Sequence, residues 1–458
     1  MKKLISKSKK ITTVGLIVVL TLTLLFTGCS NNATKATETP QTSGTNTTSV
    51  APKEPVTVDF WFEGSGPART EMFEGLIKKW NEQNPDITVN GIFIANDKAM
   101  DKINVAIAGG VNPDIVTLQP SWVGELFAQD LFVPLDEKFE AWDENKYFIK
   151  DFLDVLKGAD KQGRLLSIPQ AANLYGIWYR TDVYSQKGLE SPTTSWDAMF
   201  SNFEKTTDKG TNTYGHTIRG GSGSAVQLFY VLISYVGLPD FFDANGKAQI
   251  LRSPEAVEFV NRYADVFKKG QAPQSSLTAS FKEMAADLTS GVSMSYIHNL
   301  GSYETVGQSF KPDQYGFAMY PKSPSTDKFT AVRPTVKSNA MFKTCKNQDQ
   351  AWEFMKYWAS TESDLTINKL VGELPVRTDT MESDWVKSAP HLMQVIPFLA
   401  DENKTTVRYP NYLTDYSSIM SQIGDPAFQA VLAGSMKAEE FLGKLADALE
   451  ASYAEFKK

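Results

Sequence analysis

The side chains that could carry covalent chemistry are few in this chain and form no catalytic pattern. Of the two cysteines, Cys29 lies near the start and Cys345 far along the sequence. A catalytic thiol needs a nearby base. No motif links Cys345 to any of the three histidines, His216, His298 and His391. We therefore expect Cys345 to be a buried structural residue, and Cys29 has a separate use described below.

The acidic residues also give no pattern for catalysis or metal binding. Asp401 and Glu402 are adjacent, but glycoside hydrolysis needs two carboxyl groups about 5–10 Å apart across a bond, which a sequence does not show. Residues 243–246 look like the start of a calcium loop, yet the glycine stands at position four instead of six and the glutamate at position twelve is missing. We expect no metal, no cofactor and no enzymatic activity, which leaves binding as the chemistry to examine.

A glycine-rich segment at 219–223 precedes an apolar stretch that predicts a helix. Backbone N–H groups at the start of a helix can hold an anion, and the alternative is a flexible loop. The spacing fits neither a P-loop nor a dinucleotide-binding motif. Arg219 at the head of this segment is a candidate ligand contact.

The first 28 residues have the order of a secretory signal. Lysines come first, and an apolar run of about 16 residues follows, shorter than the roughly 20 that a transmembrane helix needs. Thr27, Gly28 and Cys29 then resemble the lipobox of bacterial lipoproteins, with Phe26 where leucine is usual. We expect Cys29 to be lipidated, so that the protein is extracytoplasmic and anchored to the cell membrane. The alternative is an ordinary cleaved signal with an incidental cysteine.

Composition separates a tether from a folded body. Residues 30–53 are rich in Thr, Ser, Asn, Ala and Pro and cannot bury enough surface to offset their ordering entropy. The segment 29–53 is therefore expected to be the lipidated cysteine and a disordered tether. About 400 residues remain, more than one hydrophobic core usually covers, which predicts two lobes. A net charge of -7, with no basic run interleaved with aromatics beyond the signal, argues against nucleic acid as a partner.

Strands and helices alternate at the start of the folded body. The expected elements are strands at 56–61, 87–89 and 113–118, a helix at 69–83, and a second helix whose apolar residues are Met100, Ile103, Val105, Ile107 and Ala108. This order predicts a parallel α/β sheet, whose ligands lie beyond the carboxyl ends of the strands. The turns after Trp61 and Leu118 are therefore expected to face a cleft.

Further segments recur in a definite order along the chain. They are 56–61, 73–85, 106–115, 131–135, 168–169, 177–182, 192–199, 242–247, 253–256 and 434–439. In this order and spacing the chain resembles the extracellular solute-binding protein family 1, which includes maltose-binding and other sugar-binding proteins of ATP-binding cassette (ABC) importers. The resemblance spans nearly all of the chain from Val56 onward.

The resemblance implies a two-lobed α/β fold of the periplasmic-binding-protein type (type II), with the ligand trapped between the lobes. By analogy, lobe one comprises 54–167 and 337–384, and lobe two comprises 168–336 and 385–458. Several chain crossings join the lobes and act as a hinge, so closure buries the solute. It further implies a monomer whose partners are a small solute and the permease subunits of an ABC importer.

Sugars need flat aromatic faces for the ring and planar polar side chains for the hydroxyls. In the family, ligand contacts often lie on the loop after the third strand, which here carries Gln119, Ser121 and Trp122. The alternative for Trp122 is that it packs in the hydrophobic core as part of the next helix. Glu63 lies in the corresponding loop after the first strand, and simple solvent exposure is its alternative.

Asn173 and Tyr175 lie in a crossing segment, where strand alternation puts both on one face. We expect this pair to face the cleft. Near the last crossing, Tyr412 and Tyr416 are further aromatic candidates, with core packing as the alternative.

The stretch 293–301 departs from the family's pattern. Sugar binders of the family often have a glycine and then a stacking tryptophan here, but this chain has His298 and Leu300. The usual stack is therefore in doubt. His298, Asn299 or Tyr303 are candidates to replace it, and an ordinary surface histidine is the alternative.

These expectations converge on a lipoprotein that binds a mono- or oligosaccharide by lobe closure and delivers it to a membrane permease. An anionic solute such as a polyol phosphate is the second possibility, favoured if Arg219 or Arg333 lies in the cleft. A secreted polysaccharide-degrading enzyme, and a sensor or adhesin that reuses the fold, are the rivals from other classes.

Overall fold

The computed structural model describes residues 55–64 and 66–458, except for the side chain of Asp97. The expected signal peptide, the lipidated Cys29 and the tether lie outside the described residues and stay predictions. Within the described part, no helix combines the length and apolar character needed to cross a membrane.

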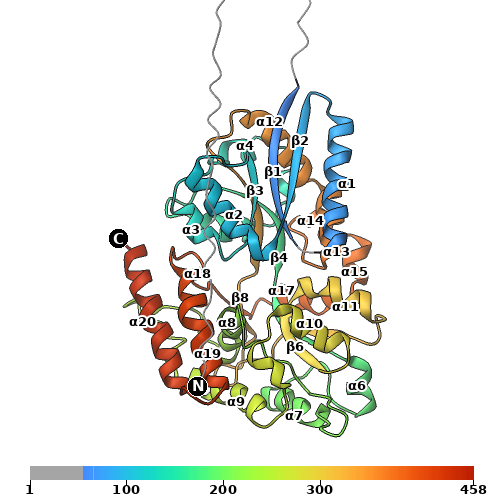
Figure 1. The fold of residues 1–458 in the computed structure, drawn as a ribbon, viewed down its shortest axis with the longest axis vertical. Helices are drawn as coiled ribbons and strands as arrows, with labels where there is room; N and C mark the ends of the chain where they lie inside the picture. The colour runs from blue at the N-terminus through green and yellow to red at the C-terminus, as the bar shows by residue number, and fades with distance from the viewer. Residues whose placement is uncertain (1–54, 65) are drawn as a thin grey trace, which may run out of the picture. The chain divides into compact units, whose positions relative to one another are not determined.

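A five-stranded sheet with strand order β2-β1-β3-β9-β4 organises the first half of the fold (Figure 1). Its strands are β1 (Val56–Gly64), β2 (Ile87–Ala95), β3 (Ile115–Leu118), β4 (Ile168–Asn173) and β9 (Thr335–Met341). β1 pairs in parallel with β2 and β3, as the sequence predicts. β9 runs antiparallel to β3 and β4, so the expectation of a fully parallel sheet is wrong at that side.

Amphipathic helices cover this sheet. The helix expected at 69–83 is α1 (Pro67–Gln83), which buries Phe73, Leu76 and Trp80. Trp80 meets Phe354 of α12 (Gln348–Trp358) with ring centroids 5.4 Å apart. In α2 (Asn96–Gly109), Ile103 is buried but Val105 is 72% exposed, so the buried face differs from the predicted one.

A three-stranded antiparallel sheet with order β6-β5-β7 organises the second half. Its strands are β5 (Tyr175–Tyr179), β6 (Ser295–Asn299) and β7 (Gly316–Ala318). The apolar helix expected after residue 223 is α8 (Ser224–Val236), which is buried on nearly all sides and therefore lies inside this half. It contacts α9 (Pro254–Lys268) and α19 (Asp425–Leu432), and α20 (Ala438–Phe456) packs beside them (Figure 1).

Many shorter helices complete the two halves. They are α3 (Val123–Phe127), α4 (Asp136–Glu140), α5 (Lys150–Ala159), α6 (Thr181–Gln186), α7 (Trp196–Thr206), α10 (Phe281–Thr289), α11 (Tyr303–Ser309), α13 (Thr361–Val371), α14 (Thr378–Met381), α15 (Asp384–Ser388), α16 (Pro390–Met393), α17 (Val395–Ala400) and α18 (Tyr416–Ile419).

The chain passes directly between the two sheets. Leu174 alone separates β4 of the first sheet from β5 of the second, and Arg333 with Pro334 separates β8 (Thr330–Val332) from β9. β8 pairs in parallel with β10 (Thr405–Val407). The predicted lobe boundaries stay a prediction. Because β4 pairs with β9, we propose that lobe one extends to Asn173 at the end of β4.

Candidate functional site

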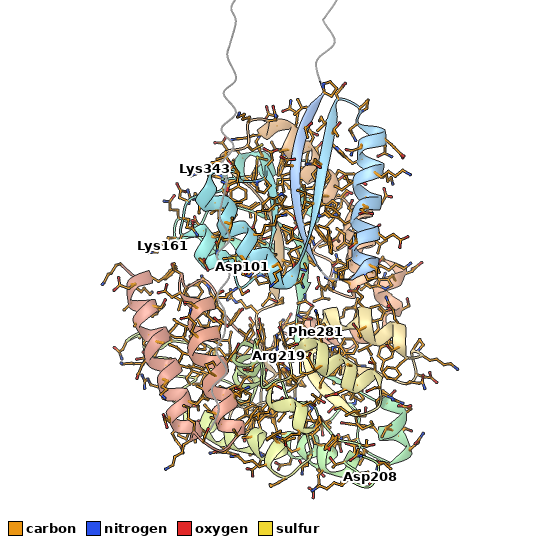
Figure 2. The ribbon with its side chains drawn as sticks, viewed as in Figure 1. Asp101, Lys161, Asp208, Arg219, Phe281 and Lys343 are labelled. Carbon is orange, nitrogen blue, oxygen red and sulfur yellow. The ribbon has the colours of Figure 1, made fainter. Side chains whose placement is uncertain are left out.

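A hollow of about 960 Å³, open to solvent, lies beyond the carboxyl end of β3 and is lined from both halves of the fold. We call it the cleft. The sequence-predicted residues that line it are Gln119, Ser121, Asn173, Tyr175, Arg219, His298 and Asn299. Gln119 and Ser121 follow directly on β3, so the prediction that the turn after Leu118 faces a cleft is confirmed. In Figure 2, Arg219 and Phe281 lie close together beside this hollow.

Stacked aromatic rings form one wall of the cleft. Tyr175 of β5 lies flat on Tyr230 of α8, with ring centroids 3.7 Å apart and planes at 14°. Tyr409 packs against Tyr230, with ring centroids 5.3 Å apart and planes at 46°. Burial raises the pKa of each of these three phenols, so their hydroxyls are neutral donors and acceptors at physiological pH.

A histidine and a phenylalanine provide a second flat surface. His298 stacks on Phe281 with ring centroids 4.3 Å apart, and its Nδ1 lies 2.7 Å from the Ser302 hydroxyl. The side chain of His298 is buried, so its surface alternative is wrong. Burial, with a smaller effect from Arg219, places the pKa of His298 well below its usual value, and the imidazole is neutral. Phe281 lines the cleft and takes a stacking position that the sequence analysis missed.

Ion pairs cross the floor of the cleft. Lys337 of β9 lines the cleft, and its Nζ lies 3.0 Å from a carboxylate oxygen of Glu63. Glu63 also accepts a hydrogen bond from the Gln119 amide. Its side chain is buried, so the solvent-exposed alternative is wrong, and Glu63 positions Lys337 and Gln119 from behind.

A second cationic group, Arg69, belongs to α1. Its Nε donates to Glu304 over 2.6 Å, and Glu373 lies close by in the cleft wall. Burial disfavours the charge on Arg69, but Glu373 and Glu304 outweigh this effect and raise its pKa, so the guanidinium stays charged. Sequence reasoning missed Arg69, Lys337 and Glu373, because they come from three distant segments and carry no motif.

Arg219 is the cleft cation without a carboxylate hydrogen-bonded to it among the described residues. Its Nε donates to the Ser222 carbonyl over 2.6 Å. Burial lowers the pKa of Arg219, with weaker opposing effects from Tyr175, Asp425 and Glu283. Gly223, with φ +78°, makes room for the guanidinium, because a Cβ there would lie 2.3 Å from Nη2.

A carboxylate of the protein itself occupies the end of the glycine-rich loop at 219–223. The backbone N–H groups of Gly223 and Ala225 donate to the carboxylate of Asp425 over 2.7 and 2.9 Å. The helix start that could have bound a ligand anion is therefore occupied by a side chain of α19. What the loop offers the cleft is the Arg219 side chain.

Amides complete the polar lining. Asn173 is buried, and its Oδ1 has no hydrogen-bond partner within the part of the chain that the structure describes. Asn299 Oδ1 accepts from the Gly301 backbone N–H over 3.0 Å, so part of its capacity stabilises a turn. Asn173 therefore has an acceptor available for a bound molecule.

Trp122 and Tyr412 lie outside the cleft. Trp122 belongs to the hydrophobic core beside α3, which is its alternative role. Tyr412 lines a neighbouring hollow, where the guanidinium of Arg408 lies 3.7 Å from the centre of its ring. Arg333 lines that neighbouring hollow as well, so of the two arginines considered for an anionic solute, Arg219 lies in the cleft.

The thiol of Cys345 is not activated as a nucleophile. Burial raises the pKa of Cys345 to about 12, so its thiol is protonated and inert. Among residues 55–64 and 66–458, no group of three or more His, Cys, Asp or Glu side chains is placed to hold a metal ion.

Comparison with known proteins identifies the family of the chain. The family described as bacterial extracellular solute-binding protein matches residues 66–364. A Brucella abortus protein named as a binding protein is 24% identical over 335 residues, which cover 72% of this chain and 78% of that protein. The sn-glycerol-3-phosphate-binding periplasmic protein UgpB of the same species is 22% identical over 407 residues, covering 83% and 90%.

Solved structures share the fold at low sequence identity. An ABC transporter solute-binding protein of Thermotoga lettingae, bound with alpha-D-tagatose, has a TM-score of 0.73 and 19% identity and covers 87% of this chain and 99% of its own. Maltose-bound MalE3 of T. maritima also gives a TM-score of 0.73 with 19% identity, covering 86% and 99%. These likenesses confirm the predicted two-lobed α/β fold.

Proposed function

Because the chain belongs to the bacterial extracellular solute-binding protein family, we propose that it captures a carbohydrate in its cleft and delivers it to the permease subunits of an ABC importer. The solute is a mono- or oligosaccharide. The family is one of solute-binding proteins, and the proposal is one of binding without catalysis.

One observation carries the carbohydrate assignment, the combination of flat rings and planar polar groups in a single hollow. The Tyr175–Tyr230 stack and the Phe281–His298 stack supply apolar faces. Gln119, Asn173 and Asn299 supply amide donors and acceptors of fixed geometry. Sugar rings need both kinds of surface.

Closure of the lobes is the second part of the proposal. Leu174 joins the five-stranded sheet to the three-stranded sheet, and Arg333-Pro334 joins the five-stranded sheet to the β8–β10 pair, so a few backbone dihedrals there can absorb a rotation of one half against the other. Rotation would bring the walls of the cleft together around the solute. We further propose a monomer, anchored to the membrane by lipidated Cys29 at the end of a flexible tether.

The test is calorimetry against a panel of mono- and oligosaccharides. We expect micromolar binding of at least one sugar, which corresponds to about 8 kcal/mol. Asn173→Ala, which removes the buried acceptor without a partner, should weaken binding about tenfold. Asn403→Ala, on an exposed turn between α17 and β10, is the matched control and should bind like wild type. Silence toward every sugar with a response to another solute would remove the carbohydrate assignment.

A second candidate solute, a phosphorylated polyol, is favoured by Arg219. This guanidinium lines the cleft and has no carboxylate hydrogen-bonded to it among the described residues. One relative is named for binding sn-glycerol-3-phosphate. Calorimetry with this compound distinguishes the candidates, because strong binding that Arg219→Ala abolishes would favour the phosphorylated solute over a neutral sugar.

A further inference from the structure

Two arginines stand side by side, one directly after β8 and one directly after β10. β8 and β10 pair in parallel with Val332 opposite Val407, and the Arg333 N–H donates to the Val407 carbonyl over 2.9 Å. Arg333 and Arg408 are the next residues of the two strands and continue this register. Neighbouring strands lie about 5 Å apart, and residues in register point to the same face. Like charges in such a pair repel.

Both arginines line a hollow that is distinct from the cleft. Its volume is about 640 Å³, and it is open to solvent. Its walls also include Gly158 of α5 and Tyr412. We call it the hinge hollow, because Arg333 belongs to the two-residue link between β8 and β9.

Arg408 is fixed in position. Its guanidinium lies 3.7 Å from the centre of the Tyr412 ring and donates through Nη2 to the Gly158 carbonyl. The remaining N–H groups of its planar fork have no acceptor among the residues that the structure describes. An arginine held in this way loses little further freedom when it binds an oxyanion.

The side chain of Arg333, unlike its backbone N–H, has no hydrogen-bond or ion-pair partner within the described part of the chain. Its side chain is exposed and makes no ion pair or hydrogen bond there. The carboxylate that lines the hollow, Asp154, is paired with Lys150 on the same helix. Burial lowers the pKa of Arg408. Tyr412 opposes this effect, and the positive charge of the neighbouring Arg333 lowers the pKa further. The pair of positive charges is therefore left without compensation.

We propose that the hinge hollow binds a small oxyanion such as inorganic phosphate between Arg333 and Arg408. Two guanidinium forks on one face match the oxygens of a tetrahedral or carboxylate anion and remove the repulsion between the arginines. The site does not depend on which solute occupies the cleft. Pro120, Thr335 and Tyr409 line both hollows, so the anion would contact the same segments that border the cleft.

The experiment is calorimetry with inorganic phosphate at constant ionic strength, with chloride as the reference anion. Wild type should bind phosphate, and Arg333→Ala should weaken this binding about tenfold or more, the factor of one charge-assisted hydrogen bond. The exposed Arg333 side chain has no hydrogen bond or ion pair to lose among the described residues, so this variant should fold normally. Asp154→Asn, which removes a negative charge from the wall, should bind phosphate more tightly than wild type.

Arg219→Ala is the matched control, because it removes a cation from the cleft and leaves the hinge hollow intact. It should bind phosphate like wild type. Phosphate binding that depends on Arg219 and survives Arg333→Ala would overturn the proposal, as would the absence of phosphate binding to wild type. A separate arm uses phosphatidylglycerol vesicles, and vesicle binding that requires Arg333 would replace the free anion by a lipid headgroup.

Discussion

The carboxylate of Glu63 at the end of β1 and the Nζ of Lys337 on β9 lie 3.0 Å apart, although β3 runs between their two strands. Both side chains are almost fully withdrawn from solvent. Removing one partner of such a pair leaves an uncompensated buried charge, whereas replacing both is often neutral. The pair therefore makes a testable contribution to stability and to the shape of the cleft floor.

Lys337→Met should lower the free energy of unfolding by about 3–5 kcal/mol, measured by urea denaturation. The double variant Glu63→Gln with Lys337→Met should recover a large part of this loss. Lys150→Met, which breaks an exposed ion pair with Asp154, is the control and should cost under about 1 kcal/mol. Equal losses for the buried and the exposed pair would contradict this reading.

Buried neutral histidines should make the protein sensitive to acid. Burial lowers the pKa of His216 to about 3 and that of His391 to about 4, whereas the unfolded chain binds these protons near pH 6.5. The unfolded state therefore binds more protons below pH 6.5, and the free energy of unfolding should fall as the pH is lowered from 6.5 toward 4. Each histidine contributes up to about 3 kcal/mol to this change.

The check for the histidines is a series of urea titrations between pH 7 and pH 4. His391→Gln should show a flatter dependence on pH than wild type, whatever its absolute stability. The slope is the informative quantity, because the His391 ring also stacks on Tyr303 with centroids 4.2 Å apart and its loss changes packing. An unchanged slope would show that His391 is protonated alike in the folded and unfolded states.

Asp364 on α13 should act in the opposite direction. Burial raises the pKa of this carboxyl to about 7, compared with 3.8 in the unfolded chain. Its contribution to stability is present at low pH and is lost as the pH rises through about 7. Asp364→Asn removes this opposing effect, so its stability should rise more steeply than that of wild type between pH 4 and pH 7. The same urea titrations measure the difference, and a shallower rise in the variant would reverse the assignment.

Gly223→Ala should disturb the cleft through Arg219. A Cβ at Gly223 would lie 2.3 Å from the guanidinium, and φ is +78°. Gly163 has a similar backbone conformation, with φ +71° and nothing within 4 Å of a built Cβ, so Gly163→Ala isolates the backbone cost of about 1 kcal/mol. Thermal unfolding and calorimetry with the cleft solute should show a larger loss of stability and weaker binding for Gly223→Ala alone. Equal behaviour of the two variants would mean that Arg219 adjusts without consequence.

The sequence predicted the positions of helices and strands better than it predicted which of their side chains are buried. The helix over 69–83 and the turn after Leu118 were predictable, because helical periodicity and the order of strands are local or short-range properties. Lys337 reaches the cleft only because the chain, after passing through the second half, returns to the first sheet as β9. Trp122 and Glu63 are buried instead of exposed to the cleft, since burial depends on neighbours that are remote in the sequence.

The return of β9 to the first sheet also sets how the molecule can be divided. Neither sheet and its covering helices correspond to one continuous stretch of chain, so a truncated gene for either half would encode an open sheet edge and an exposed core. The two halves should therefore melt together in a single transition, even though the proposed closure moves one half against the other.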